Sequence, residues 1–358
     1  MYPPKPFRKT QTQRHVPLLN NRYHPLNAIR LTTLLLTTCM LSGWVSAADD
    51  HCKRYHTAIW DNDAIAFDDA GYSHSFAYAW GYAKPECATN WAQTVNHWMT
   101  GVSSWQGLSS GYKTTLGYKI AHEIYTPTDI QDAELIEDDR PYTGLMYGTL
   151  YMQHYTIDSA TRYEFLAGAV GPMTGSEAIQ NMVHTIIGAQ NPNGWDNQIG
   201  NEIVLRAALE KSWRVYSSDN LISGYETDTI ILADAKLGNL NSDIGTGVSF
   251  RIGRGLAQSY PEHWLTPGYG LFSTHLKPGD WGVFATLYGS YVFNDITIEG
   301  NTFNDSHGVP LIHVQGRYVI GGYYQINQFG FATSIQESTD MFKNSDENTL
   351  YMTLSFSY

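Results

Sequence analysis

Several features are scarce or absent in this 358-residue chain. Its 22 lysines and arginines are outnumbered by 34 aspartates and glutamates, and this excess of negative charge argues against binding to nucleic acid. After residue 47, no apolar stretch approaches the roughly twenty residues that a membrane-spanning helix requires. Neither the HExxH helix nor the Walker loop occurs. Cysteine is also rare, with three residues in the whole chain.

The amino-terminal segment has the composition of an export signal. Its first 47 residues contain six basic side chains and no acidic one, and an apolar run from Leu31 to Trp44 leads to Val45-Ser46-Ala47. This order of basic, apolar and small residues predicts a signal peptide that is cleaved after Ala47 or nearby. Residues 48–358 then form the mature chain, and the loss of six cations takes the net charge from −12 to −18.

Export and the absence of a spanning helix leave two classes of protein, a secreted soluble protein or an outer-membrane barrel. In either class, Cys52 and Cys87 of the mature chain can form a disulfide, with two unpaired thiols as the alternative.

The end of the chain favours the barrel. From residue 350 to 358, large apolar side chains alternate with tyrosine, serine and threonine, and the chain ends on Tyr358. This pattern resembles the terminal strand of bacterial outer-membrane barrels. Residues 73–82 alternate large aromatic with small side chains, as expected for a lipid-facing wall around a narrow lumen. The aromatic residues of that segment are Phe76, Tyr78, Trp80 and Tyr82.

Alternating runs recur along the mature chain. They lie near residues 57, 73, 114, 145, 161, 202, 227, 245, 281, 312, 328 and 348. These runs predict an all-β fold, a transmembrane antiparallel β-barrel of about twelve strands that forms a single domain over residues 48–358. Long connections lie on the extracellular side of such barrels. The long polar connections are Ala83–Tyr112, Tyr125–Asp139, Gly171–Asn201 and Tyr260–Asp280.

One helical pattern interrupts the strands. Apolar residues recur at helical spacing, which predicts a short helix over residues 176–188 in an extracellular loop. Thr174 and Glu177 have the spacing of a capping box, and Gly188 is a natural stop. The apolar stripe consists of Ile179, Val183, Ile186 and Ile187.

Two groups of polar residues are candidates for chemistry. Gln180 and His184 lie one turn apart on the polar face of the predicted helix, with a solvated surface histidine as the alternative. The sequence Asp61-Asn62-Asp63 ends the first predicted strand, and Asp68 and Asp69 follow in the turn. Their oxygen atoms are ligands of the kind that Ca²⁺ prefers, with a metal-free acidic turn as the alternative.

Six segments carry a family resemblance, namely DNDAIAF, GYSHSF, DDRPYTG (138–144), GAVGPMTG (168–175), IQNMVHTIIGA (179–189) and GWDNQIGNE (194–202). In this order, and over essentially the whole mature chain, they resemble the outer-membrane lipid A 3′-O-deacylase family. The resemblance implies a twelve-stranded barrel in the bacterial outer membrane. It also implies hydrolysis of an acyl ester of lipopolysaccharide, the 3′-linked chain of its lipid A.

The resemblance also implies five catalytic residues by position. His184 is the general base that activates water, and Gln180 lies beside it. Asn62, Asp63 and Ser73 are also metal ligands, for a Ca²⁺ ion that forms the oxyanion site. The family's active site lies between the barrel wall and the loop helix and faces the outer leaflet. Lipid A and outer-membrane lipid are therefore the expected partners, with no nucleic acid and no obligate protein partner.

One position departs from the family pattern. Some members carry a lysine in the loop after the third strand, and here Asp132 stands about where that lysine would be. Arg140 is a candidate for the missing phosphate contact, with an inward structural arginine paired to Asp138 or Asp139 as the alternative. Two other functions stay open, a catalytically inactive lipopolysaccharide-binding barrel of the same family and an outer-membrane phospholipase.

Overall fold

The structure is a computed structural model that describes most of the chain after residue 53. The described ranges are 54–62, 71–82, 113–222, 224–259, 276–327, 329–343, 345 and 351–357, with single positions between 87 and 97. The predicted signal peptide lies outside these residues and stays a prediction. Cys87 is disulfide-bonded, and its partner lies outside the described residues.

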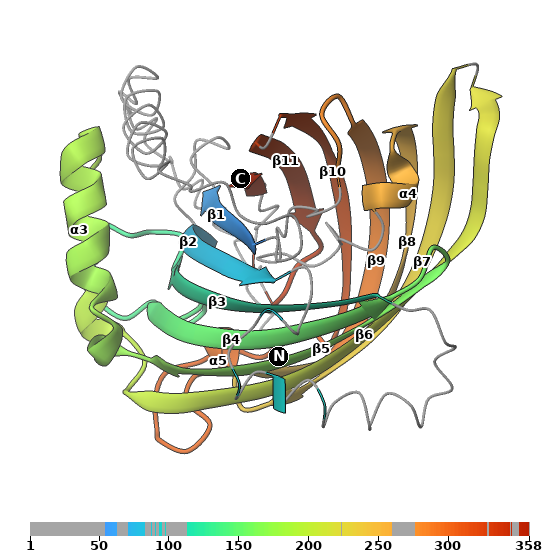
Figure 1. The fold of residues 1–358 in the computed structure, drawn as a ribbon. Coiled ribbons are helices and arrows are strands. Elements are labelled where there is room, and N and C mark those ends of the chain that lie inside the picture. Colours follow the sequence, from blue (N-terminus) through green and yellow to red (C-terminus); the bar gives the residue numbers. More distant parts are fainter. Residues whose placement is uncertain are drawn as a thin grey trace, which may run out of the picture.

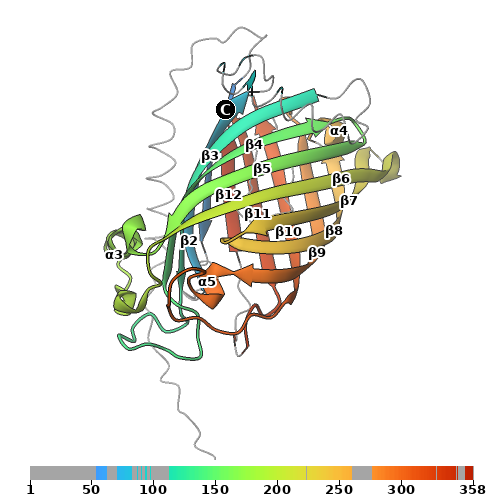
Figure 2. The same ribbon diagram turned by 90° about the horizontal axis from the view of Figure 1, so that it is seen from below.

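Within the described residues, twelve antiparallel strands form one closed sheet. Each strand pairs with its neighbours in the sequence (Figures 1 and 2). β1 also pairs with β12, which closes the barrel. The strands are β1 (Arg54–Asn62), β2 (Gly71–Tyr82), β3 (Lys113–Thr126), β4 (Thr143–Tyr155), β5 (Ser159–Val170), β6 (Glu202–Ile222), β7 (Tyr225–Gly238), β8 (Asn241–Arg254), β9 (Trp281–Asp295), β10 (Val314–Ile326), β11 (Phe329–Ser338) and β12 (Tyr351–Ser357). The predicted fold is confirmed.

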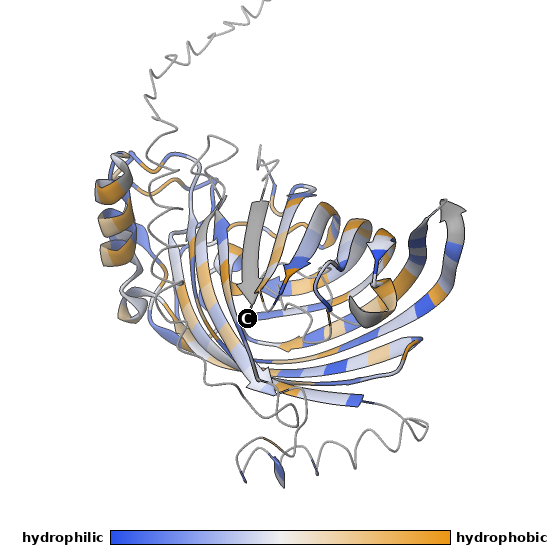
Figure 3. Cartoon of the chain, turned by 45° about the horizontal axis from the view of Figure 1, so that its top comes forward, coloured by the Kyte–Doolittle hydropathy of each residue, from blue (hydrophilic) through white to orange (hydrophobic). Residues whose placement is uncertain are grey.

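The two faces of the wall follow the alternation in the sequence. In β2, Phe76 points outward and is 41% exposed, whereas Ala77 and Ala79 are buried inside. An alternation of hydrophobic and hydrophilic residues runs along several strands in Figure 3. Since successive side chains of a strand point to opposite faces, this pattern gives an apolar outer wall and a polar lumen.

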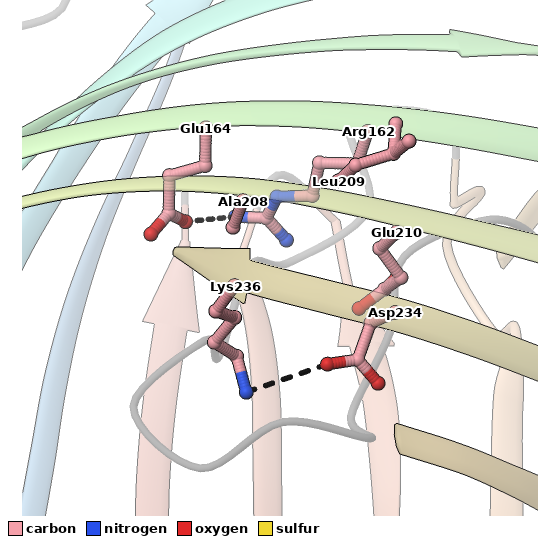
Figure 4. A pocket seen from close by; sticks show the side chains of 7 residues that line it. All are labelled: Arg162, Glu164, Ala208, Leu209, Glu210, Asp234 and Lys236. Atoms are coloured by element: carbon pink, nitrogen blue, oxygen red, sulfur yellow. Dashed lines mark ion pairs between the residues drawn. The ribbon is translucent and has the colours of Figure 1, made fainter. Parts of the chain in front are cut away.

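Paired charges fill much of the lumen. Buried charges need partners of opposite sign, and the inward faces supply them. Ion pairs join Arg206 with Glu164 at 2.8 Å, Arg251 with Asp228 at 2.6 Å and Lys236 with Asp243 at 3.0 Å. Figure 4 shows part of this network around a pocket of about 20 Å³, where Arg162 lies towards Glu164 and Lys236 towards Asp234.

The connections alternate between the two ends of the barrel. The β3–β4 and β5–β6 connections leave what is called here the helix end, because the β5–β6 connection carries α3 (Ser176–Ile187). The β2–β3 and β8–β9 connections leave the opposite end. The expectation that all four long polar connections share one side is therefore wrong for 83–112 and 260–280, since length alone does not reveal the parity of a connection.

Short helices accompany the connections. η3 (Pro172–Thr174) precedes α3, η4 (Trp195–Asn197) follows it, α4 (Leu256–Ser259) follows β8, and α5 (Ile296–Glu299) follows β9. No helix in the described part of the chain has the length and apolar character to cross a membrane.

Helix α3 lies close to its predicted position. It ends at Gly188, whose φ of +77° is the left-handed conformation that glycine adopts readily. Its N-cap is Gly175, which offers no side chain to the free amides of the first turn. The predicted capping box between Thr174 and Glu177 is therefore wrong, because the Thr174 hydroxyl bonds to the carbonyl oxygen of Gly171 instead.

Candidate active site

Helix α3 buries the polar side chains of Gln180 and His184 and exposes the apolar side chains of Met182 and Ile186. Gln180 and His184 are 2% and 4% exposed, whereas Met182 and Ile186 are 56% and 54% exposed. A surface helix of a soluble protein shows the reverse arrangement. His184 is therefore not a solvated surface histidine, and the polar face of α3 has its partners within the protein.

The start of α3 packs closely against β4. A Cβ atom added to Gly144 would fall 2.0 Å from Ser176 Oγ and 2.3 Å from Thr174 Oγ1. Helix α3 contacts β3 and β4 and lies beside the barrel wall, not in the lumen (Figures 1 and 2). The glycine that ends the DDRPYTG segment thus makes room for the helix that carries His184.

A hydrogen-bond chain ties this start of α3 to β3. The Thr174 hydroxyl donates to the carbonyl oxygen of Gly171 at 2.8 Å, so it accepts from Ser176 Oγ at 2.7 Å. Ser176 Oγ then accepts from His122 Nε2 at 2.9 Å. Each hydroxyl uses its single hydrogen once, which fixes the direction of the chain.

Two buried aromatic residues support Gln180. Trp195 Nε1 donates to Gln180 Oε1 at 2.8 Å, and the Trp195 ring lies 5.0 Å from the ring of Tyr142. Both rings pack on Ile124 of β3. Sequence reasoning did not single out either aromatic residue, although each lies within a segment that resembles the family, DDRPYTG or GWDNQIGNE. A large aromatic residue within two positions of a glycine in such a segment was the available signal.

His184 has a defined orientation. Its Nδ1 lies 2.6 Å from the carbonyl oxygen of Gln190, two residues beyond the end of the helix turn at Gly188. A carbonyl oxygen only accepts, so Nδ1 carries the hydrogen. In the neutral ring the lone pair that can take a proton is then on Nε2.

The β3–β4 loop packs beside the segment that follows α3. The backbone amide of Asn193 donates to Ile130 at 2.8 Å, and its side chain donates to the carbonyl oxygen of Gln131 at 3.1 Å. These bonds hold Asp132 close to the site, where its exposed carboxylate accepts from the amide of Glu134. The loop therefore presents negative charge beside the segment that follows α3, about where the resemblance led us to expect a lysine.

Strands β1 and β2 bring two predicted ligands to the same end of the barrel. Asn62 is the last residue of β1 and pairs with His74, the neighbour of Ser73 in β2. The register of β2 against β3 shifts between Tyr72 and His74. Asp63 lies outside the described residues, and the roles of all three ligands stay predictions. Among the described residues, no group of three histidine, cysteine or acidic side chains could hold a metal.

Arg140 has a structural position. Its guanidinium donates to the carbonyl and hydroxyl oxygens of Thr297 and lies over the ring of Tyr125 at 4.9 Å. The expected pairing with Asp138 or Asp139 is wrong, since the guanidinium points to the β9–β10 connection. Because Arg140 is only 1% exposed, it is also poorly placed for contact with a substrate phosphate.

Two cavities among the described residues of the barrel lack the two helix residues. A cavity of about 170 Å³ lies among inward-facing side chains such as Glu123, Arg206 and Arg317. Neither Gln180 nor His184 lines this cavity or the smaller pocket of Figure 4. The two candidate residues lie instead on the buried side of α3, the helix that contacts β3 and β4.

The comparison with known families covers nearly the whole chain. Residues 32–358 match the family described as outer membrane protein LpxR. The chain belongs to this family. Membership confirms the resemblance that the sequence segments indicated and supports a location in the outer membrane.

Solved structures agree on the fold. LpxR from Salmonella typhimurium matches with a TM-score of 0.69 and 19% identity, over 86% of this chain and 99% of that one. At this identity the likeness establishes the barrel and not the chemistry. The translocator domain of NalP from Neisseria meningitidis and the transport unit of AIDA-I from Escherichia coli match with TM-scores of 0.34 and 0.38. Both are 8% identical over 94% of this chain and 98% of theirs, and such scores carry no argument. No curated protein matches the chain.

Proposed function

We propose that this protein is an outer-membrane lipid A deacylase that hydrolyses an acyl ester of lipopolysaccharide, the 3′-linked chain of lipid A. Family membership supports the substrate class. The observation that carries the proposal is the polar face of α3, which turns Gln180 and His184 towards the barrel wall. A buried histidine of fixed orientation beside a buried amide suits hydrolysis better than it suits a purely structural helix.

In this proposal His184 is the general base. Nε2 takes a proton from water as the water oxygen adds to the ester carbonyl carbon, and the same proton passes to the leaving alkoxide when the ester bond breaks. The bond from Nδ1 to Gln190 holds the ring and stabilises its positively charged form during the step. The products are a free fatty acid and the sugar hydroxyl.

Asn62, Asp63 and Ser73 are the proposed ligands of Ca²⁺. They offer an amide, a carboxylate and a hydroxyl oxygen, and Asn62 and Ser73 belong to adjacent strands at the helix end. These oxygen donors are of the hard type that Ca²⁺ prefers. A calcium ion bound there would supply positive charge for the oxygen that becomes negative in the reaction.

The outer surface supports access from the membrane. Met173, Met182 and Ile186 are exposed around α3, and Met146 is exposed on the neighbouring β4. Apolar side chains on the outside of an outer-membrane barrel face lipid. Acyl chains would therefore approach the site along the wall, with the helix end of the barrel in the outer leaflet.

Removal of His184 tests the proposal. Lipid A from cells that express the wild type should lose the mass of one acyl chain, whereas His184→Ala should leave lipid A unchanged. Mass spectrometry measures both, and a heat-dependent shift in gel mobility shows that the barrel has folded. His97→Ala is the matched control, because His97 is exposed and belongs to the β2–β3 connection at the opposite end. Deacylation by His184→Ala would exclude this residue as the base.

A catalytically inactive lipopolysaccharide-binding barrel is the second candidate. The exposed Asp132, in place of a cation, is the observation that favours it. Unchanged lipid A in cells with folded wild-type protein, together with binding of lipopolysaccharide to the purified barrel, would support this alternative.

A further inference from the structure

The side-chain amide of Gln180 has an unused donor in a buried position. Its oxygen accepts from Trp195, whereas Nε2 has no hydrogen-bond partner among the described residues. The side chain is 2% exposed, so water does not readily take the place of a partner. Buried donors without acceptors are rare and costly, which makes an acceptor supplied by a ligand the natural explanation.

Trp195 determines which end of this amide is free. An indole N–H only donates, so it bonds the oxygen of the amide and never the nitrogen. With Oε1 held by Trp195, Nε2 must occupy the other side. This argument assigns the two ends of the amide from the chemistry of its neighbour, in the way such assignments are made generally.

Trp195 is itself held in place. It is 2% exposed, and its ring packs on Tyr142 at 5.0 Å between centroids. The preceding residue is Gly194, and a Cβ atom there would fall 2.6 Å from the Tyr142 ring. A bulkier residue at position 194 would thus push the two rings apart. The indole donor is therefore fixed in position before any substrate arrives.

The free donor lies next to the proposed base. Gln180 and His184 are one turn apart on the same buried face, so their side chains are neighbours. An ester carbonyl whose carbon is attacked by water at His184 can then place its oxygen near Gln180 Nε2. A fixed donor aimed at an oxygen that gains negative charge accelerates acyl transfer by roughly a hundredfold or more.

We propose that Trp195 is a positioning residue for ester hydrolysis. It holds the Gln180 amide so that Nε2 is presented to the carbonyl oxygen of the ester beside His184. The inference rests on the proposed deacylase function. It concerns orientation more than packing, because phenylalanine at position 195 would keep an aromatic ring beside Tyr142 and lose the indole donor, together with part of the ring volume.

The kinetic test uses the purified full-length barrel in detergent micelles with lipopolysaccharide and saturating Ca²⁺. Trp195→Phe should lower kcat by about tenfold or more and leave KM within about twofold, because the donor acts on the transition state. Gln180→Glu should lower kcat by about a hundredfold or more, since the carboxylate still accepts a hydrogen bond from Trp195 but offers no donor to the ester. Trp213→Phe on the outer wall of β6 is the matched control and should match the wild type.

A spectroscopic measurement separates the inference from the proposed function. The indole N–H resonance of Trp195 should exchange slowly with solvent in the wild type and faster in Gln180→Leu, whether or not any ester is cleaved. Slow exchange in a wild type that hydrolyses no lipid A would contradict the deacylase function and leave the Trp195 contact established.

Three results would overturn the inference. In the first, Trp195→Phe has the same kcat as the wild type. In the second, Trp195→Phe changes only KM. The third is a wild-type kcat for Gln180→Glu. If Trp195→Phe does not fold into a heat-modifiable barrel, the kcat of Gln180→Glu tests the inference instead. This variant keeps Trp195 and its hydrogen bond to residue 180.

Discussion

Substitution of Gly144 by alanine should uncouple the helix from the barrel. The added Cβ would lie 2.0 Å from Ser176 Oγ, 2.3 Å from Thr174 Oγ1 and 2.5 Å from Ser176 Cβ. Rotation of the serine hydroxyl cannot relieve the last contact, because Cβ is attached directly to the helix backbone. An ordinary contact begins at 3.4 Å, so the start of α3 must retreat by about 1.4 Å from the 2.0 Å contact, or by 0.9 Å from the Cβ contact.

A shift of this size should reach the two proposed catalytic residues. Gln180 and His184 belong to the same rigid helix as Ser176, and misplacement by about 1 Å can cost a hundredfold in rate. The expected result is a loss of roughly a hundredfold in ester hydrolysis with a barrel that still folds, since the backbone of Gly144 keeps its pairing with Ile124. The assay is the release of fatty acid from lipopolysaccharide by purified protein, with gel mobility as the test of folding.

Gly148→Ala is the matched control. It lies four residues further along β4 on the same face, and the nearest atom to its added Cβ is the carbonyl oxygen of Lys119 at 3.9 Å. This variant should keep wild-type activity. Full activity of Gly144→Ala would refute the close docking of α3, and an equal loss in Gly148→Ala would show that any added methyl group on β4 is harmful.

Three further predictions concern the metal, the loop and the anchor of the helix. Chelation by EGTA should stop hydrolysis and added Ca²⁺ should restore it; full activity after thorough calcium removal would exclude the metal role of Asp63. Asp132→Lys should raise the rate on phosphorylated lipid A by roughly fivefold, because a change of two charges about 10 Å from a phosphate is worth about 1 kcal/mol in water. The same change at Asp219, at the opposite end, should have no effect in that assay. His122→Phe removes the donor to Ser176 and should lower kcat several-fold, as measured by fatty-acid release.

The barrel could be predicted from the sequence because alternation is a local property. Phe76 and Ala77 differ in size, and their opposite exposure follows directly from the geometry of a strand. The position of α3 could also be predicted, because the helical spacing of its apolar residues stops at Gly188, which is its C-cap. The ends at which loops emerge depend on the order of all strands, which is why the side of 83–112 and 260–280 was mistaken.

The candidate site could be predicted only in part from the sequence. The spacing of Gln180 and His184 placed both on one helix face, but spacing does not reveal which face is buried. An ordinary helix would bury its isoleucines, and the surrounding apolar medium of an outer-membrane barrel changes this preference. Trp195 was missed because its bond to Gln180 joins two segments whose contact depends on the tertiary fold.

The partners of α3 have a consequence for when the proposed active site can form. Gly144 and His122 belong to β4 and β3, so the helix has no docking surface until these two strands have paired. Its exposed Met182 and Ile186 also favour a lipid environment over water. The proposed catalytic site is therefore incomplete until β3 and β4 have paired, so hydrolysis of lipid A is expected only from a barrel that has closed in its membrane.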